Sequence, residues 1–234
     1  MAKAAQLMLI KPRGGKRRGA GRPAKGARAS SPHKARPRLA ARYPVHVVMR
    51  VTPEVGSLRR QVAFRAMGAA TSSAAKRRDF RIIQLSLQRT HVHLIVEADN
   101  EISLARGMQG FQISAARHLN AAVGHRRGSV FTDRYYAVTI TSPRQARHVL
   151  SYVMNNWRHH CEDREPKMAT WKIDWCSSAI AFPGWAEYDD VPRPWRGPAT
   201  YVPLVVRAPA TWLLREGWKK HGATISCREA PVRP

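Results

Sequence analysis

The stretch that decides the fold is FRIIQLSLQRTHVHLIVEA, residues 80–98. Two apolar runs of strand length flank a short polar connection at Gln88-Arg89-Thr90, so this stretch predicts a β-hairpin with strands Phe80–Leu87 and His91–Ala98. The second strand begins with His91-Val92-His93. Because residues i and i+2 of a strand lie on the same face, the two imidazoles project together.

The segments outside this hairpin continue the alternation of strands and helices. Before the hairpin, apolar periodicity predicts a strand at Val45–Val51 and a helix at Leu58–Arg78. After it, the same signal predicts a helix at Ile102–Val123 and a strand at Ala137–Ile140. The complete order is typical of a ferredoxin-like (split βαβ) α+β fold, with an antiparallel sheet and helices on one face. A last helix, from about Arg144 to Cys161, is appended to it, with Ser142 suited to its N-cap and Pro143 to its first position.

The charge of the chain indicates a polyanionic partner. The 234 residues carry a formal net charge of +26, far more than solubility requires. Nucleic acid is the first candidate partner and an anionic membrane surface the second. No apolar run approaches the roughly 20 residues of a membrane span, so we expect no membrane segment. The three scattered cysteines argue against a disulfide framework and favour a cytoplasmic location.

Composition divides the chain into three parts. Residues 1–42 lack Asp and Glu and are predicted to form a disordered basic arm. Within this arm Arg22, in Gly21-Arg22-Pro23, resembles the minor-groove arginine of an AT-hook, although a solvated tail with non-specific phosphate attraction is the alternative. Residues 43–165 form the predicted main domain. Residues 166–234 are rich in Trp and Pro and are expected to wrap the core, their tryptophans either packing or stacking on unpaired bases.

Two groups of side chains could carry chemistry. His91 and His93 lie in an otherwise apolar strand, where an unpaired imidazole is costly, and a divalent metal ion would explain the pair; satisfied core histidines are the alternative. On the last helix a spacing of four places His148, Tyr152 and Asn156 on one face. A tyrosine can act as a covalent nucleophile, or it can be an ordinary interfacial aromatic.

His91-Val92-His93, VFTDRYY at residues 130–136 and YVMNN at residues 152–156 together resemble the HUH endonuclease superfamily of single-tyrosine transposases. Within it they are most similar to the REP-associated tyrosine transposases, over roughly residues 43–160. The resemblance implies that His91 and His93 bind Mg²⁺ or Mn²⁺, with Asn156 as candidate third ligand. It also implies that Tyr152 is the nucleophile, that the product is a 5′-phosphotyrosine link with a free 3′-hydroxyl, and that the location is bacterial and nucleoid-associated.

Some choices stay open at this point. Family members often have proline after the asparagine, but here Trp157 follows Asn156, and the adjacent Asn155 is a second candidate ligand. Tyr135 and Tyr136 compete with Tyr152 as nucleophiles, although stacking or packing suits them better. The basic residues predicted to contact DNA, besides that of the arm, are Arg126, Arg127 and Arg134; for the first two, a merely solvated turn is the alternative.

The function predicted by this resemblance is a transposase-like single-strand DNA endonuclease and strand transferase acting on hairpin or repeat DNA. The alternative is a non-catalytic nucleic-acid-binding regulator on the same fold. A plasmid relaxase or replication initiator of the same superfamily is less consistent with one short domain that lacks a P-loop. Single-stranded or hairpin DNA is the expected partner, without a membrane, and the protein acts as a monomer or a homodimer.

Overall fold

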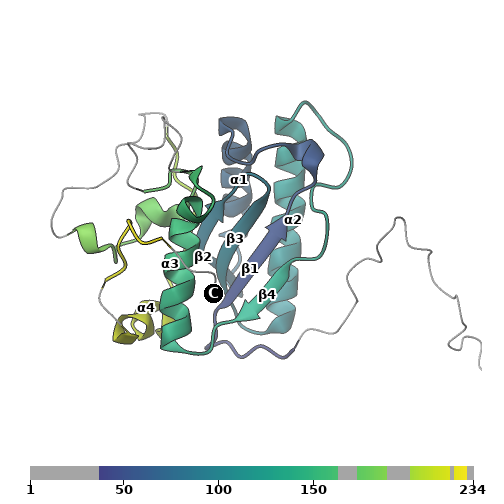
Figure 1. The fold of residues 1–234 in the computed structure, drawn as a ribbon. Coiled ribbons are helices and arrows are strands. Elements are labelled where there is room, and N and C mark those ends of the chain that lie inside the picture. The colour runs from purple at the N-terminus through teal and green to yellow at the C-terminus, as the bar shows by residue number, and fades with distance from the viewer. Residues whose placement is uncertain (1–36, 163–172, 189–200, 222–223, 231–234) are drawn as a thin grey trace, which may run out of the picture. The chain divides into compact units, whose positions relative to one another are not determined.

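The sheet of the molecule has four antiparallel strands in the order β2-β3-β1-β4 (Figure 1). The computed structural model describes residues 37–162, 173–188, 201–221 and 224–230. The strand bounds are β1 Val45–Arg50, β2 Phe80–Leu87, β3 His91–Ala98 and β4 Tyr136–Thr139. The strand that carries the two motif histidines is therefore central, and β4 is an edge.

One face of the sheet is covered by two long helices, α1 (Gln61–Ala74) and α2 (Glu101–Ala122) (Figure 1). The alternate residues Val45, Val47 and Met49 of β1 face these helices and belong to the first hydrophobic core. At Gly107 the α2 backbone passes so close to β2 that a Cβ would lie 2.2 Å from the Phe80 ring. Only glycine permits this approach.

The opposite face of the sheet is covered by α3 (Pro143–His159), which packs against β2 and β3. A second hydrophobic core lies here, and it includes Ile83, Ile95 and the apolar face of α3. The described part of the C-terminal segment completes this core with Trp185, Trp218 and other buried side chains. Its helical elements are short: α4 (Trp212–Arg215) and 3₁₀ turns at Ser178–Ala181, Ala186–Tyr188 and Gly217–His221.

The predicted ferredoxin-like element order and antiparallel sheet are confirmed, and the hairpin strands have their predicted bounds. The first helix begins later than Leu58, because the Leu58 backbone amide donates to the Arg89 carbonyl and so belongs to the turn before the helix. The division into three domains stays a prediction. Packing already starts at Leu39, which is buried in the first core, and residues 1–36 lie outside the described residues.

None of the helices in the described part of the chain is long and apolar enough to cross a membrane.

Candidate active site

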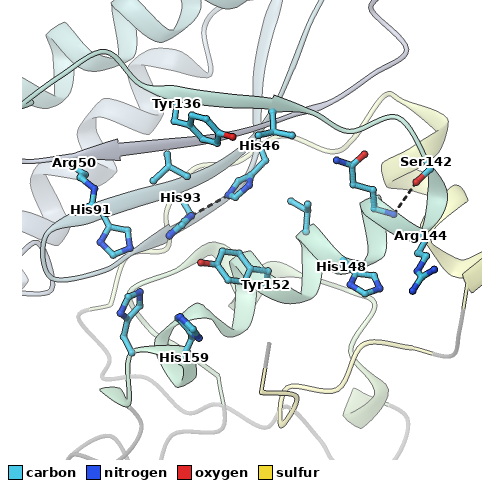
Figure 2. Close-up of a pocket in the computed structure, with 15 residues that line it drawn as sticks. His46, Arg50, His91, His93, Tyr136, Ser142, Arg144, His148, Tyr152 and His159 are labelled. Carbon is cyan, nitrogen blue, oxygen red and sulfur yellow. Dashed lines mark hydrogen bonds between the residues drawn. The ribbon is translucent and has the colours of Figure 1, made fainter. Parts of the chain in front are cut away.

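The two groups of residues predicted to carry chemistry meet in one cavity between the sheet and α3. The cavity has a volume of about 720 Å³, and its lining includes His91 and His93 of β3 together with Tyr152 of α3 (Figure 2). These strand and helix positions are far apart in the sequence, because α2 and β4 lie between them. The fold therefore brings together the histidine pair and the tyrosine.

Local sequence determines how Tyr152 is presented. The Ser142 hydroxyl caps α3 by accepting from the Gln145 amide, and Pro143 occupies the first turn, so the helix starts at a defined residue. Tyr152 then falls on the face of α3 that covers the sheet, and it is 6% exposed. Its ring meets that of His93 edge-on, with the centroids 5.3 Å apart. Its hydroxyl points into the cavity on the side of the two motif histidines (Figure 2).

Burial keeps the motif histidines uncharged. Desolvation, aided by His160 and Arg50, lowers the pKa of His91 from 6.5 to about 4. Desolvation and the neighbouring histidines lower the pKa of His93 to about 2. A neutral imidazole has a lone pair for a metal ion, whereas a charged one does not. Both side chains are therefore in the protonation state that a metal site needs at neutral pH.

A third histidine, His46 of β1, holds His93 in place. Its Nε2 lies 3.1 Å from Nδ1 of His93, and the rings are stacked at an interplanar angle of 18°. Burial lowers the pKa of His46 to about 4, so this hydrogen bond joins two neutral rings. With Nδ1 engaged, Nε2 is the remaining nitrogen of His93, and it is buried without a hydrogen-bond partner. Sequence reasoning missed His46 because it reads as one residue of an ordinary strand.

Asn156, the candidate third ligand, does not line the cavity. It is fully buried one turn beyond Tyr152, and both its amide atoms lack a hydrogen-bond partner. Asn155 instead donates to the Ser226 carbonyl and so contacts the C-terminal segment. Of the two asparagines, Asn156 is the one with unused donor and acceptor groups, and its role as a ligand stays a prediction.

The residues present fit a divalent ion in part. His93 offers a buried, unpartnered nitrogen, His91 lies beside it with ring centroids 4.9 Å apart, and Asn156 has an unpartnered amide oxygen. Within the described ranges, no three or more His, Cys, Asp or Glu side chains are grouped so that they could hold a metal ion. An ion held here would thus have few protein ligands and would keep open positions for water or phosphate oxygens.

The two rival tyrosines lie in different environments. Tyr135 is 9% exposed and belongs to the first core, on the far side of the sheet from the cavity. Tyr136 is 67% exposed and lines the cavity from β4. Its position therefore argues against Tyr135 as the nucleophile, whereas Tyr136 stays a candidate because it lines the cavity.

The predicted DNA-binding arginines are spread over the molecule. Arg126 bonds Asn120, the Ser129 carbonyl and Thr52, so its guanidinium orders its own loop. Arg127 and Arg134 are exposed, and none of the three lines the cavity. Arg22 lies outside the described residues. Contacts of these four residues with DNA stay predictions.

Besides His148, which its spacing from Tyr152 had singled out, the cavity contains basic residues that sequence reasoning did not select. Arg50 pairs with His91 across the strands β1 and β3, and Arg144 lies in the first turn of α3. These two arginines lie at opposite ends of the cavity, on either side of Tyr152 (Figure 2). His148 lies at the Arg144 end, and His159 and His160, at the end of α3, lie near Tyr152 and His91. The position of His148 four residues before Tyr152 was the only sequence signal for this group.

The family model for IS200-like transposases matches residues 40–156, half of the chain. The chain belongs to this family. Its matched region contains the sheet, α1, α2 and α3 as far as Asn156, so it includes the histidine pair and Tyr152. The resemblance to single-tyrosine transposases is confirmed at the level of the family.

A solved structure supports the fold of this IS200-like transposase. A REP-associated tyrosine transposase bound to a REP hairpin matches it with a TM-score of 0.51 and 14% identity, over 77% of this chain and 100% of that chain. A putative transposase from Deinococcus radiodurans R1 matches with a TM-score of 0.36 and 14% identity, over 58% of this chain and 98% of the other. A search of curated proteins gave no match.

Proposed function

We propose that this transposase cuts and rejoins single-stranded DNA next to hairpins, through a covalent link to Tyr152. The observation that carries the proposal is the edge-on contact between Tyr152 and His93 in one cavity. This contact supports the proposal because a tyrosine hydroxyl, a potential nucleophile, lies beside two neutral imidazoles in a protein whose net charge is +26. Hairpin DNA is proposed as the substrate because the solved REP-associated transposase of the same fold is bound to a REP hairpin.

The proposed reaction exchanges one phosphate ester for another. The Tyr152 oxygen attacks the scissile phosphorus and loses its proton to solvent, while the bond from phosphorus to the 3′-oxygen breaks and that oxygen takes up a proton. The products are a 5′-phosphotyrosine link and a free 3′-hydroxyl. Attack on the link by a 3′-hydroxyl reverses the step and joins strands. The ester bond is conserved throughout, so joining requires no nucleotide cofactor.

The chain's own groups support this step by position and charge. His91 and His93, with Asn156 as candidate third ligand, would hold Mg²⁺ or Mn²⁺. When bound, such an ion offsets negative charge on the phosphate and orients it for in-line attack. Arg50 and Arg144, at the two ends of the cavity, would bind the phosphates that flank the scissile one. A tyrosine hydroxyl is a weak nucleophile without this assistance.

A covalent-capture experiment tests the proposal. The protein is incubated with Mn²⁺ and a labelled pool of hairpin oligonucleotides whose unpaired arms are randomised, so that the pool contains every short target sequence. We expect a complex that survives denaturant, and sequencing of the captured DNA gives the cleavage site. Tyr152→Phe should abolish the complex. Tyr136→Phe, which removes the hydroxyl of the other tyrosine in the cavity, should retain it.

Two outcomes would count against this account. A complex that persists in Tyr152→Phe and disappears in Tyr136→Phe would move the nucleophile to β4. Tight hairpin binding with no adduct at any metal concentration would favour the non-catalytic regulator, which needs the basic surface but no nucleophile.

A further inference from the structure

Tyr136 is an unusually exposed aromatic for a residue that lines a cavity. It is 67% exposed, whereas Tyr152 on the other side of the same cavity is 6% exposed. Figure 2 shows its ring above the histidines, across the cavity from Tyr152. No side chain in the described part of the chain covers most of this ring, so its apolar face is available to a ligand.

The neighbours of Tyr136 extend this bare surface. Tyr136 is directly opposite Val48 in the pairing of β4 with β1, and Val138 follows two residues later on the same face. Val48 and Val138 are half-buried and both line the cavity. The three side chains form an apolar floor, which we call the β4 platform. It lies beside the position proposed for the reacting phosphate, in a cavity whose other lining residues are mostly histidine, arginine, serine and glutamine.

Polar groups border the β4 platform from the start of α3. Arg144 and His148 are exposed there and line the same cavity. Gln145 accepts from the Thr141 amide through Oε1, so its side-chain orientation is fixed and its amide nitrogen remains a donor. A flat apolar surface with a cation and hydrogen-bond donors at its margin matches an unpaired nucleotide: the base stacks, and the phosphate and base edge meet the polar groups.

We propose that the β4 platform binds one unpaired base of the DNA strand, next to the scissile phosphate, by stacking on Tyr136. This inference rests on the proposed function for the identity of the strand, but not on the nucleophile. An aromatic face accepts any base, so the platform orients the strand, and sequence preference comes from the polar margin. Stacked on the platform, the base fixes the position of its own phosphate relative to Tyr152.

A double-mutant cycle, with one change in the protein and one in the DNA, tests the proposal. A hairpin with mixed-sequence unpaired arms is prepared with an abasic site at each unpaired position in turn. Its affinity is measured by fluorescence anisotropy at fixed salt, in a Tyr152→Phe background that cannot cleave. We expect Tyr136→Ala to weaken binding about 10-fold. We also expect one abasic position to weaken binding similarly, and the two effects to be non-additive when they are combined.

Matched variants separate stacking from general effects. Tyr136→Phe and Tyr136→Trp should keep the affinity, because both retain an aromatic face. Ile113→Ala, at a 55% exposed position on α2 on the other face of the sheet, should change nothing. Because Tyr136 is exposed, its replacement removes little packing, and the thermal midpoint should be unchanged.

The outcomes of this test are independent of catalysis. If the effects of Tyr136→Ala and of the abasic site simply add at every position, the platform does not bind a base and the inference is wrong. If the coupling is found but wild type forms no adduct, the platform stands and the proposed function fails. If the coupling is found and the wild type also forms an adduct, the abasic position that is coupled to Tyr136 should adjoin the cleavage site found by covalent capture.

Discussion

The hydrogen bond between His46 and His93 is the interaction on which the proposed metal site depends most. It engages Nδ1 of His93 at 3.1 Å and leaves the buried Nε2 for a ligand. Partners of this kind orient metal-binding histidines, and their removal typically lowers metal affinity about 10- to 100-fold. His46 itself lies outside the two-histidine motif, so its effect is separable from the removal of a ligand.

Replacement of His46 by phenylalanine tests this role. Phenylalanine preserves the stacked ring but removes the hydrogen bond, so we expect Mn²⁺ affinity to fall by about 10-fold. Calorimetric titration of the protein without DNA gives this value directly. His118→Phe, at an exposed histidine on α2, should bind as wild type does. Equal affinity in His46→Phe would show that the bond has no role in ligand orientation.

The lowered pKa values of the site histidines also predict a dependence of stability on pH. The pKa of His46 falls from 6.5 in the unfolded chain to about 4 in the folded one, and His91 behaves alike. Between these values the unfolded chain binds protons that the folded chain does not. The free energy of unfolding is therefore highest above about pH 6.5 and decreases as the pH falls towards 4.

Urea unfolding with a chelator present, compared at about pH 7 and pH 5, measures this decrease. We expect about 1–2 kcal/mol from each deeply buried imidazole. His46→Phe should show a smaller decrease over the same interval, because one titrating group has been removed. A pH dependence identical in the two proteins would contradict the pKa assigned to His46.

At the scale of elements, α3 is held in place from both sides. Its inner face packs on the sheet, and its outer face is tied to residues 224–230. Glu229 accepts from Arg147 and Ser151, while Asn155 and Arg158 donate to the carbonyls of Ser226 and Cys227. The C-terminal segment thus fixes the helix that carries Tyr152.

Removal of the Glu229 carboxylate should loosen this attachment. We expect Glu229→Ala to lower the free energy of unfolding by about 1–3 kcal/mol, because several donors are left without a partly buried acceptor. Glu216→Ala removes an exposed pair with Lys219 and should cost less than about 0.5 kcal/mol. Chemical denaturation compares the two, and hydrogen exchange should rise in α3. Similar stability for both variants would show that the segment does not restrain the helix.

The sequence predicts elements well where the periodicity is strong and local. The strands of the hairpin, the N-cap at Ser142 and the fourth strand follow from alternation and capping chemistry within a few residues. The start of α1 does not, because it depends on the bond from Leu58 to Arg89 in a distant turn. His46 escapes prediction for the same reason, since it meets His93 only when β1 and β3 pair.

At the scale of the whole molecule, long-range ion pairs join the parts of the described structure. Arg59 forms a bidentate ion pair with the fully buried Asp174. Glu162, just after α3, forms a second ion pair with Arg89 in the hairpin turn. The pair of Glu162 and Arg89 joins the end of α3 to the hairpin that carries the two motif histidines. Partners so far apart in the chain leave no local pattern, so sequence reasoning could not find them.

The charge distribution predicts a salt dependence that belongs to the whole chain. Residues 1–36 contain eleven Lys and Arg side chains and no Asp or Glu. If they bind DNA phosphates, their deletion should flatten the plot of log affinity against log salt, by about 0.7 for each phosphate of a single strand that they neutralise. Anisotropy titrations at several salt concentrations measure the slope. An unchanged slope would show that residues 1–36 do not contribute to binding.

The most direct test of the central claim is to identify the residue that carries the DNA. After covalent capture, the DNA is trimmed by nuclease and the protein is digested with trypsin for mass spectrometry. The peptide His148–Arg158 contains Tyr152 as its only tyrosine, and the peptide Tyr135–Arg144 contains both rivals. The proposed mechanism predicts a nucleotide mass on Tyr152 alone. A nucleotide on Tyr135 or Tyr136, or on neither peptide, would contradict it.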